Sequence, residues 1–275
     1  MKDNYLQQLK SHADLFSLQG KTAAVIGGGG HVCSALANGF ASAGANVAII
    51  DIRLEKAEAV AKDIKEKFGV KTVGICADAT KQNELVEMMK LLLNFSGKID
   101  IAVNGGGINS PEPFLEIKET DWQKVVDSQL TATYLGCQVF GKHMLQNNSG
   151  SIINISSASA QRPLSRVVGY SASKAAIDNF TKWMAVELAG KYGQGIRVNA
   201  IAPGFFIGEQ NRSLLLSPDG NLTPRGVKII EHTPMGRFGI PEDLDGILLF
   251  LCSDMSKFVT GITVSVDGGF GASSI

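Results

Sequence analysis

Seven short apolar runs constrain the fold of this 275-residue chain more than any other feature. Their apolar residues are continuous rather than alternating, which is typical of strands covered on both faces. Helical periodicity of about 3.6 residues fills the stretches between them, as in AEAVAKDIKEKFG and QNELVEMMKLLLNFSG, each ending in a glycine that can terminate a helix. We therefore predict an α/β fold, a Rossmann-type doubly wound sheet of seven parallel strands with helices on both faces. The runs are TAAVIG, NVAIID, TVGICAD, IDIAVNG, SIINISS, IRVNAIAPG and GITVSVDGG.

The segment 204–239 interrupts this rhythm between the sixth and seventh runs. It is too long for an ordinary connection and contains its own apolar clusters. An insertion after a strand of such a sheet lies where ligands bind, so we expect a substrate lid rather than a structureless loop. The rest of the chain is short enough for one core, and we predict a single dinucleotide-binding domain over residues 1–275.

Charge and cysteine usage limit the partners. Basic and acidic residues both number 26, and no basic stripe suited to nucleic acid is visible. Residues 1–21 contain no continuous apolar stretch, so we expect a mobile or surface-packed lead-in, neither a signal peptide nor a membrane span. The cysteines follow no CxxC spacing, and we expect reduced, buried thiols of a cytoplasmic protein, with no metal site. They are Cys33, Cys76, Cys137 and Cys252.

A glycine-rich turn follows the first predicted strand. It reads Gly27-Gly28-Gly29-Gly30-His31-Val32-Cys33 and leads into a helical stretch, where backbone N–H groups can hold a pyrophosphate. Asp51 ends the second run and can accept hydrogen bonds from the adenosine ribose, whereas its charge would repel a 2'-phosphate. Either feature alone could be a tight turn or a helix cap, but together they predict a site for NAD(H) in preference to NADP(H). Asp78 can either cap the next helix or meet the adenine amino group.

A candidate catalytic group lies at the fifth run and in the helix after it. Ser157 follows the run, at the carboxyl edge where this architecture places its active site. Tyr170 and Lys174 are four residues apart and therefore share one face of a helix. A phenol titrates near pH 10, so a nearby ammonium would make it a better acid-base catalyst. YxxxK alone occurs by chance in many helices, but with the serine and the dinucleotide turn it predicts catalysis.

These motifs, in this order, resemble the short-chain dehydrogenase/reductase superfamily from Leu18 to the end of the chain. Further matching elements are Asn104-Gly105-Gly106-Gly107, Pro203-Gly204 and Val266-Asp267-Gly268-Gly269. The resemblance implies hydride transfer between a nicotinamide and a carbonyl or alcohol carbon. Ser157 would bind the substrate oxygen, Tyr170 would exchange its proton, and Lys174 would lower the tyrosine pKa and hold the nicotinamide ribose. It also implies a homotetramer. The cofactor contacts it implies are Gly27, Gly29, Gly30, His31, Val32, Asp51, Asp78, Ala79, Asn104, Gly105, Gly106, Tyr170, Lys174, Pro203, Gly204 and Ile207.

Several positions depart from the superfamily pattern TGxxxGxG and its partners. Ile26 replaces the threonine, and His31 and Cys33 replace the second and third glycines. His31 can contact the pyrophosphate or simply face solvent. Gln129 stands where an asparagine usually holds a water of the proton relay, and we expect it to take that catalytic role. Gly208 stands where a threonine often contacts the nicotinamide carboxamide, so that contact must come from elsewhere.

The carboxyl third is most similar to the D-mannonate oxidoreductase (D-fructuronate reductase) branch, through IAPGFFIGEQNRSLLL and LTPRGVKIIEHTPMGRFGIPEDL. A hexuronate needs a guanidinium or ammonium for its carboxylate and amides for its hydroxyls. We expect Ser157 and Tyr170 to bind the carbonyl, with Arg162, Asn211 and Arg212 as the other substrate residues. Arg166, Asn109 and His232 are further candidates, and each arginine could instead be a solvated surface charge.

Two alternative functions stay open, and the sequence argues against a third. The substrate could be another sugar acid or polyol, such as 5-ketogluconate. The altered glycine turn and Gln129 leave room for a catalytically silent NAD-binding sensor, against which Ser157, Tyr170 and Lys174 argue. Gly169-Tyr170-Ser171-Ala172-Ser173 nearly matches the GxSxG of serine hydrolases, but its closing glycine is absent and no histidine lies near the chain end.

Overall fold

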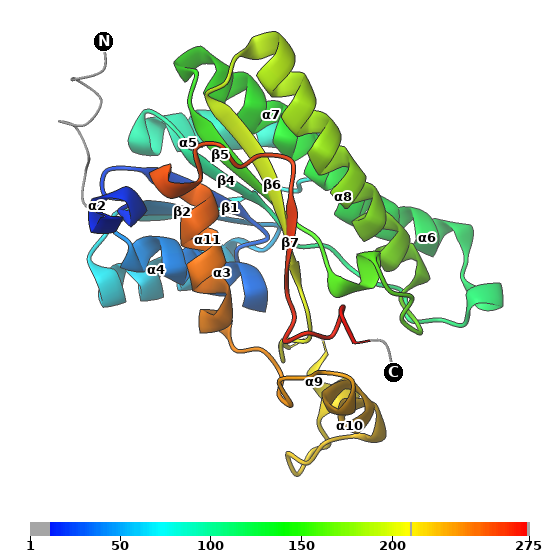
Figure 1. Cartoon of the computed structure of the whole chain (residues 1–275). Helices are drawn as coiled ribbons and strands as arrows, with labels where there is room; N and C mark the ends of the chain where they lie inside the picture. The colour runs from blue at the N-terminus through cyan, green and yellow to red at the C-terminus, as the bar shows by residue number, and fades with distance from the viewer. Residues whose placement is uncertain (1–11, 210, 274–275) are drawn as a thin grey trace.

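A seven-stranded, fully parallel sheet forms the centre of the protein (Figure 1). The computed structural model describes residues 12–209 and 211–273. The strand order is β3-β2-β1-β4-β5-β6-β7, so the direction of winding reverses between β1 and β4. All seven predicted strands and the doubly wound topology are thereby confirmed. The strands are β1 (Thr22–Ile26), β2 (Asn46–Asp51), β3 (Thr72–Cys76), β4 (Ile101–Asn104), β5 (Gly150–Ile155), β6 (Ile196–Pro203) and β7 (Thr263–Val266).

Helices cover both faces of the sheet (Figure 1). One face carries α3 (His31–Ser42), α4 (Leu54–Phe68) and α11 (Asp245–Cys252), and the other carries α5 (Gln82–Ser96), α7 (Ala132–Asn147) and α8 (Val168–Glu187). Side chains alternate across each strand. In β1, Ala23 and Val25 join the first core cluster and Ala24 and Ile26 the second. This two-sided burial is the reason that the strands read as continuous apolar runs.

The two glycines expected to end helices do so. Gly69 after α4 and Gly97 after α5 adopt left-handed conformations with φ of 69° and 75°. Each donates its N–H to a carbonyl in the last turn of its helix, and only glycine adopts this conformation at no steric cost. In contrast, α8 begins at Val168, two residues before the predicted start at Tyr170.

All four cysteines are free, and three of them are buried as expected. The prediction of four buried thiols is wrong for Cys76, which is exposed. Cys76 ends β3, an edge strand that has a neighbour on one side only. Its Sγ lies 3.4 Å from the Ile52 carbonyl oxygen in the adjacent loop. An apolar run does not show whether its strand is at the edge, and this is why the sequence misassigned the residue.

The insertion 204–239 contains two helices that project beyond the end of the sheet near β7 (Figure 1). It contains α9 (Arg212–Leu215) and α10 (Pro224–Glu231), which pack together. Thr223 caps α10 by accepting the Gly226 N–H at 3.0 Å. The two ends of the insertion meet in a parallel bridge between Phe206 and Gly239. Its length is therefore taken up in folded structure and not in a loose connection.

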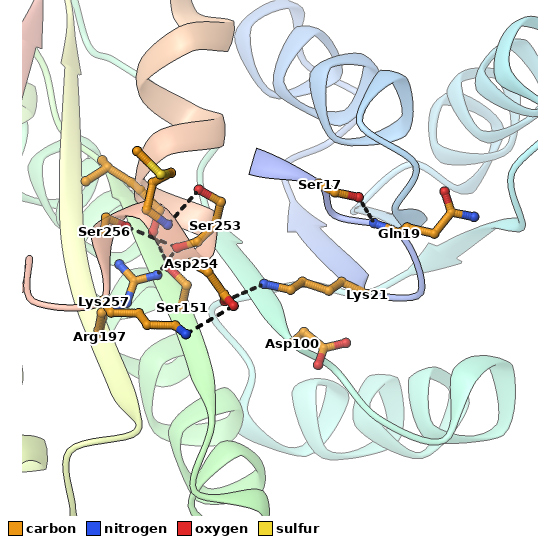
Figure 2. A network of polar contacts seen from close by, with 12 residues as sticks. Ser17, Gln19, Lys21, Asp100, Ser151, Arg197, Ser253, Asp254, Ser256 and Lys257 are labelled. Carbon is orange, nitrogen blue, oxygen red and sulfur yellow. Dashed lines mark hydrogen bonds and ion pairs between the residues drawn. The ribbon is translucent and has the colours of Figure 1, made fainter. Parts of the chain in front are cut away.

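A polar network lies at the amino-terminal ends of the strands (Figure 2). Asp254, in η6 (Asp254–Ser256), pairs with Lys21 at 3.5 Å and Lys257 at 3.2 Å. Arg197 of β6 donates to the carbonyl oxygens of Ser253 and Val259. These contacts join the starts of β1 and β6 to the segment before β7.

The predicted lead-in 1–21 lies partly outside the described residues. Its described part contains the short helix α2 (His12–Phe16), which packs against η6, and the buried Leu18. Within the described part of the chain, no helix is both long and apolar enough to cross a membrane. The remaining short elements are η1 (Phe114–Glu116), α6 (Glu119–Val126), η2 (Asp127–Thr131), η3 (Ala158–Ala160), η4 (Leu188–Tyr192) and η5 (Pro241–Leu244).

Candidate active site

Two glycine turns meet at the point where the winding of the sheet reverses. Gly27 follows β1 with φ of 72°, and Gly106 follows β4 with φ of 89°. A Cβ added at Gly27 would lie 2.7 Å from the Gly106 Cα, so the two backbones are in direct contact. Neither position has space or a favourable backbone conformation for a side chain. The ligand crevice of a doubly wound sheet opens at this reversal, above the carboxyl ends of the strands.

A cavity of about 240 Å³ opens beside these turns and joins the predicted cofactor and catalytic residues. It extends from the glycine-rich turn to the start of α8 and to the segment after β6. Its predicted lining residues are Gly27, Gly29, Gly30, His31, Val32, Gly106, Gln129, Tyr170, Lys174 and Asn211. The other lining residues were not predicted as ligand contacts from the sequence. They are Cys33, Arg53, Lys56, Gly107, Ile155, Phe206, Gly208 and Glu209.

Asp51 lies at the carboxyl end of β2, buried against the glycine-rich turn. Its Oδ2 accepts the Gly29 N–H at 3.1 Å, and its Oδ1 accepts the Arg53 N–H at 3.1 Å. A Cβ at Gly29 would lie 2.7 Å from Oδ2, so only glycine fits here. The Arg53 Nε is 3.7 Å from Oδ1. The carboxylate is thus fixed beside the turn, where the sequence placed it, with one cation close by.

Ser157, Tyr170 and Lys174 come together from two elements. Ser157 follows β5 and accepts the N–H and the hydroxyl of Ser159 at 3.2 and 3.1 Å, which fixes its side chain. The buried Lys174 ammonium lies 5.3 Å from the centre of the Tyr170 ring and donates to the Ile155 carbonyl oxygen at 2.5 Å. The helical spacing of four residues therefore places the tyrosine and the lysine side by side.

Burial controls the protonation of this group. It lowers the pKa of Lys174 from 10.5 to about 8, although Cys33 and Asp178 act in the opposite direction. It raises the pKa of Tyr170, against a hydrogen bond with Ser157 that lowers it. The expectation of a lowered tyrosine pKa is therefore not met, because the loss of hydration outweighs other effects. The structure presents a neutral phenol next to a lysine that is charged at pH 7.

Gln129 lies in a π-helical turn, η2, that interrupts the helix running from α6 into α7. Such turns often re-aim a side chain at a functional site. Its Nε2 donates to the Ile108 carbonyl oxygen at 3.0 Å, and its buried Oε1 has no partner among the described residues. A Cβ at Gly107 would lie 2.4 Å from Nε2, so this glycine makes room for the longer amide. Gln129 thus offers an unused acceptor in a residue that lines the cavity.

Other predicted cofactor residues serve the framework around the cavity. Asn104 donates to Asn154 Oδ1 at 3.0 Å, and Asn154 donates to Thr181 at 3.0 Å, which braces β4, β5 and α8. Asp78 accepts the N–H and hydroxyl of Thr80 at 2.9 and 2.7 Å in the turn before α5, whose N-cap is Lys81. The predicted residues that do not line the cavity are Asp51, Asp78, Ala79, Asn104, Gly105, Pro203, Gly204, Ile207, Ser157, Arg162 and Arg212.

Of the three polar residues predicted to bind the substrate beside the catalytic group, two make hydrogen bonds to the backbone and one is exposed. Asn211 holds its own loop, because its Oδ1 accepts the Gly208 N–H and its Nδ2 donates to the Phe206 carbonyl oxygen, both at 2.8 Å. Arg162 donates its Nε to the Gly271 carbonyl oxygen at 2.8 Å and so anchors the carboxyl-terminal segment. Arg212 is exposed at the start of α9.

Arg225 was not singled out from the sequence, yet it links the insertion to the loop that precedes Tyr170. From the first turn of α10 it donates to the hydroxyl and carbonyl of Ser165 at 2.9 and 3.4 Å. Arg166, next in this loop, has φ of 66°, and its carbonyl oxygen accepts from Asn109 at 3.1 Å. No ion pair of Arg162, Arg166 or Arg225 is found among the residues described, unlike Arg237, which pairs with Asp243.

The arrangement fits a dinucleotide. Three features favour one: glycines that a Cβ would block, the helix α3 starting at the cavity wall, and the carboxylate of Asp51 at the second strand. Gly27, Gly29, Gly30 and the first N–H groups of α3 would hold the pyrophosphate. Tyr170 and Lys174 lie at the other end, where the nicotinamide half belongs. In the part of the chain with assigned structure, no three His, Cys, Asp or Glu side chains cluster as metal ligands.

The fold and this constellation define an oxidoreductase that acts on CH–OH groups. A family model described as enoyl-(acyl carrier protein) reductase matches residues 32–271. The chain belongs to the short-chain dehydrogenases/reductases.

Three members of that family are similar to this chain over almost its whole length. An uncharacterized oxidoreductase of Bacillus subtilis named UxuB is 44% identical over 94% of this chain and 97% of its own length. A crystal structure from Haemophilus influenzae, of a candidate D-mannonate oxidoreductase with bound NAD, has a TM-score of 0.87 and 38% identity over 95% of this chain and 98% of that one. A gluconate 5-dehydrogenase of Burkholderia cenocepacia, in complex with NADP and tartrate, has a TM-score of 0.87 and 31% identity over 95% and 99%.

Proposed function

We propose that this protein reduces D-fructuronate to D-mannonate with NADH. The observation that carries the proposal is the neutral Tyr170 phenol beside Ser157 and the charged Lys174, next to the cavity suited to a dinucleotide. The similarity to a candidate D-mannonate oxidoreductase supports the choice of substrate. Interconversion of 5-ketogluconate is the second candidate, supported by the similarity to a gluconate 5-dehydrogenase.

The protonation state of Tyr170 suits reduction. Bound NADH supplies a hydride to the carbonyl carbon, and the carbonyl oxygen must gain a proton as negative charge develops on it. Tyr170, whose pKa is raised by burial, retains its proton at neutral pH and donates it to that oxygen. The Ser157 hydroxyl donates a hydrogen bond to the same oxygen, and its interaction with Ser159 keeps it in place.

Lys174 and Gln129 support the proton donor. The Lys174 charge stabilises the phenolate that Tyr170 becomes after giving up its proton. The unpartnered Oε1 of Gln129 can accept a hydrogen bond from a water in the cavity, and this water would help to return a proton from solvent. We therefore assign the four catalytic roles to Ser157, Tyr170, Lys174 and Gln129.

Cofactor choice depends on the end of β2. The buried Asp51 carboxylate is suited to ribose hydroxyls and disfavours a phosphate, so we propose that NADH is preferred over NADPH. The preference is expected to be limited, because Arg53 and Lys56, which line the cavity, carry positive charge. The two crystal structures compared above hold NAD in one case and NADP in the other.

A sugar-acid carboxylate requires a cation at the mouth of the site. Arg162 and Arg166 lie in the loop before Tyr170 and Arg225 contacts that loop, and none of the three has a carboxylate partner among the described residues. An arginine fork binds a carboxylate with two parallel hydrogen bonds. Within the described part of the chain, Arg225 hydrogen-bonds to Ser165 alone, which a carboxylate can replace, and we place Arg225 first among the carboxylate-binding candidates.

The substrate is tested by NADH oxidation with D-fructuronate, 5-keto-D-gluconate, simple ketoses and acyl ketones. D-Fructuronate is expected to give the highest kcat/KM. Activity with acyl ketones alone would refute the sugar-acid proposal. Fastest turnover of 5-keto-D-gluconate would select the second candidate.

The catalytic assignment is tested by Tyr170→Phe, which removes only the hydroxyl. We expect kcat to fall by about 10²- to 10⁴-fold. NADH binding, measured by fluorescence, is the control and should change little. Turnover equal to that of the wild type would refute the role of Tyr170. NADH binding without turnover of any substrate by the wild type would favour the silent sensor.

We also propose that the protein is a cytoplasmic homotetramer. Exposed apolar side chains on α7 and α8, Tyr134, Trp183 and Val186, are suited to contact with other subunits. Sedimentation equilibrium should give four times the chain mass of 29.2 kDa. A Trp183→Glu, Val186→Glu variant should shift the mass downward.

A further inference from the structure

The segment 206–209, which follows β6, makes two contacts at this cavity, one with His31 at the end of the glycine-rich turn and one with Lys56 of α4. At the first, a Cβ added to Gly208 would lie 3.0 Å from the His31 Cβ and 3.2 Å from its Cγ. At the second, Glu209 pairs with Lys56 of α4 at 2.9 Å. All four residues line the cavity suited to the dinucleotide. The segment therefore roofs the part of the cavity where the pyrophosphate would lie.

Hydrogen bonds of Asn211 and the buried side chain of Phe206 fix the position of this roof. The Gly208 N–H donates to Asn211 Oδ1, and Asn211 Nδ2 donates to the Phe206 carbonyl oxygen, both at 2.8 Å. Phe206 is buried and bridges to Gly239. Asn211 and the bridge at Phe206 therefore brace the backbone around Gly208 against a larger residue at this position.

The contact at Gly208 is limited by space and not by backbone strain. Gly208 is absent from the residues with positive φ, so a side chain could adopt its conformation. The His31 side chain occupies the volume that such a side chain would need. His31 begins α3, directly after the turn that approaches the pyrophosphate. The size of residue 31 therefore decides the size of residue 208.

We propose that His31 and Gly208 form a size-matched pair that sets the height of the 206–209 roof above the bound dinucleotide. His31 is a positioning residue in this pair, because it acts on the cofactor through the roof. A larger residue at 208 lifts the roof while His31 is present and is accommodated when residue 31 is glycine. The proposal rests on the dinucleotide site proposed above but not on the carbonyl substrate, since NADH binding and the stability of the free protein both report on it.

The test compares Gly208→Thr, His31→Gly and the double variant with the wild type. Without cofactor, Gly208→Thr should lower the melting temperature by about 2 to 6 °C, since overpacking is costly in a fixed segment. It should also weaken NADH binding, measured by fluorescence, by about tenfold. The double variant should recover at least half of both losses. Gly208→Ala keeps the test usable if the threonine variant does not fold.

Two further variants separate positioning from a general loss of stability. His31→Asn keeps Cβ and Cγ and should bind NADH within about threefold of the wild type, whereas His31→Gly should raise the KM for NADH more than it lowers kcat. Gly246→Thr, at an open position of α11, is the matched control and should combine additively with His31→Gly.

Additive losses in the His31→Gly, Gly208→Thr variant would overturn the proposal, as would a Gly208→Thr protein with unchanged melting temperature and unchanged NADH affinity. A wild type that binds no NADH would refute the proposed function, and the melting temperatures of the four proteins would then decide the size match alone. Recovery of stability without recovery of NADH affinity would overturn the positioning role.

Discussion

Replacing Lys174 with methionine is expected to stabilise the protein while abolishing reduction. Burial lowers the pKa of this lysine from 10.5 to about 8, which corresponds to a cost of about 3 kcal/mol for keeping it charged at pH 7. Methionine removes that cost but leaves the Ile155 carbonyl oxygen without its donor, a loss of about 1 kcal/mol. The net gain of about 2 kcal/mol should raise the melting temperature by about 4 °C in a chain of this size.

The gain has a defined dependence on pH. Below pH 8 Lys174 is protonated in both the folded and the unfolded chain, so the difference between variant and wild type is constant. Between pH 8 and 10.5 the unfolded chain holds a proton that the folded chain has lost, so the stability of the wild type rises relative to the variant. Burial of Cys137 and Cys252 raises their pKa values to about 12, which lowers the stability of both proteins alike above pH 9.

The assay is urea unfolding of the cofactor-free proteins at pH 7.5 and pH 10, together with NADH oxidation. Lys174→Met should be the more stable at pH 7.5, and its advantage should disappear by pH 10. Tyr170→Phe is the matched control, because it should lose activity without a comparable gain, as its phenol is already neutral. A variant less stable than the wild type at pH 7.5 would refute the reasoning, since the buried charge would then not be costly.

Three further predictions follow from single contacts. Asp51→Asn should lower the ratio of KM for NADPH to KM for NADH by about tenfold in steady-state kinetics, and an unchanged ratio would contradict the role of its charge. Arg225→Gln should raise the KM for D-fructuronate by about tenfold, and Arg212→Gln is the control; equal effects would argue against Arg225. Gly105→Ala places a Cβ 2.3 Å from the Cys33 Sγ and should cost about 1 to 3 kcal/mol in urea unfolding, with partial relief by Cys33→Ala.

The frame of the active site could be predicted because it follows from local rules. Continuous apolar runs identified the strands, and the spacing of four between Tyr170 and Lys174 placed both on one side of α8. Asp51 was expected at the dinucleotide site because it ends the strand that follows the glycine-rich turn.

The features that the sequence did not reveal depend on contacts between distant segments. Arg225 meets Ser165 across 60 positions, and nothing in either segment indicates the pairing. The raised pKa of Tyr170 results from the hydration that its phenol loses in the folded protein, and a motif carries no such information. Cys76 is exposed because β3 is an edge strand, which only the strand order shows.

The bridge between Phe206 and Gly239 has a consequence for how specificity can change in this protein. Because the two ends of the insertion meet in this bridge, residues 212–238 can be exchanged as a cassette without altering the strand register. A Cβ at Gly239 would lie 2.5 Å from the Phe206 ring, so both junction residues should be retained in a chimera. Substrate range could then be grafted between family members while the proton donor and the dinucleotide turn stay in place.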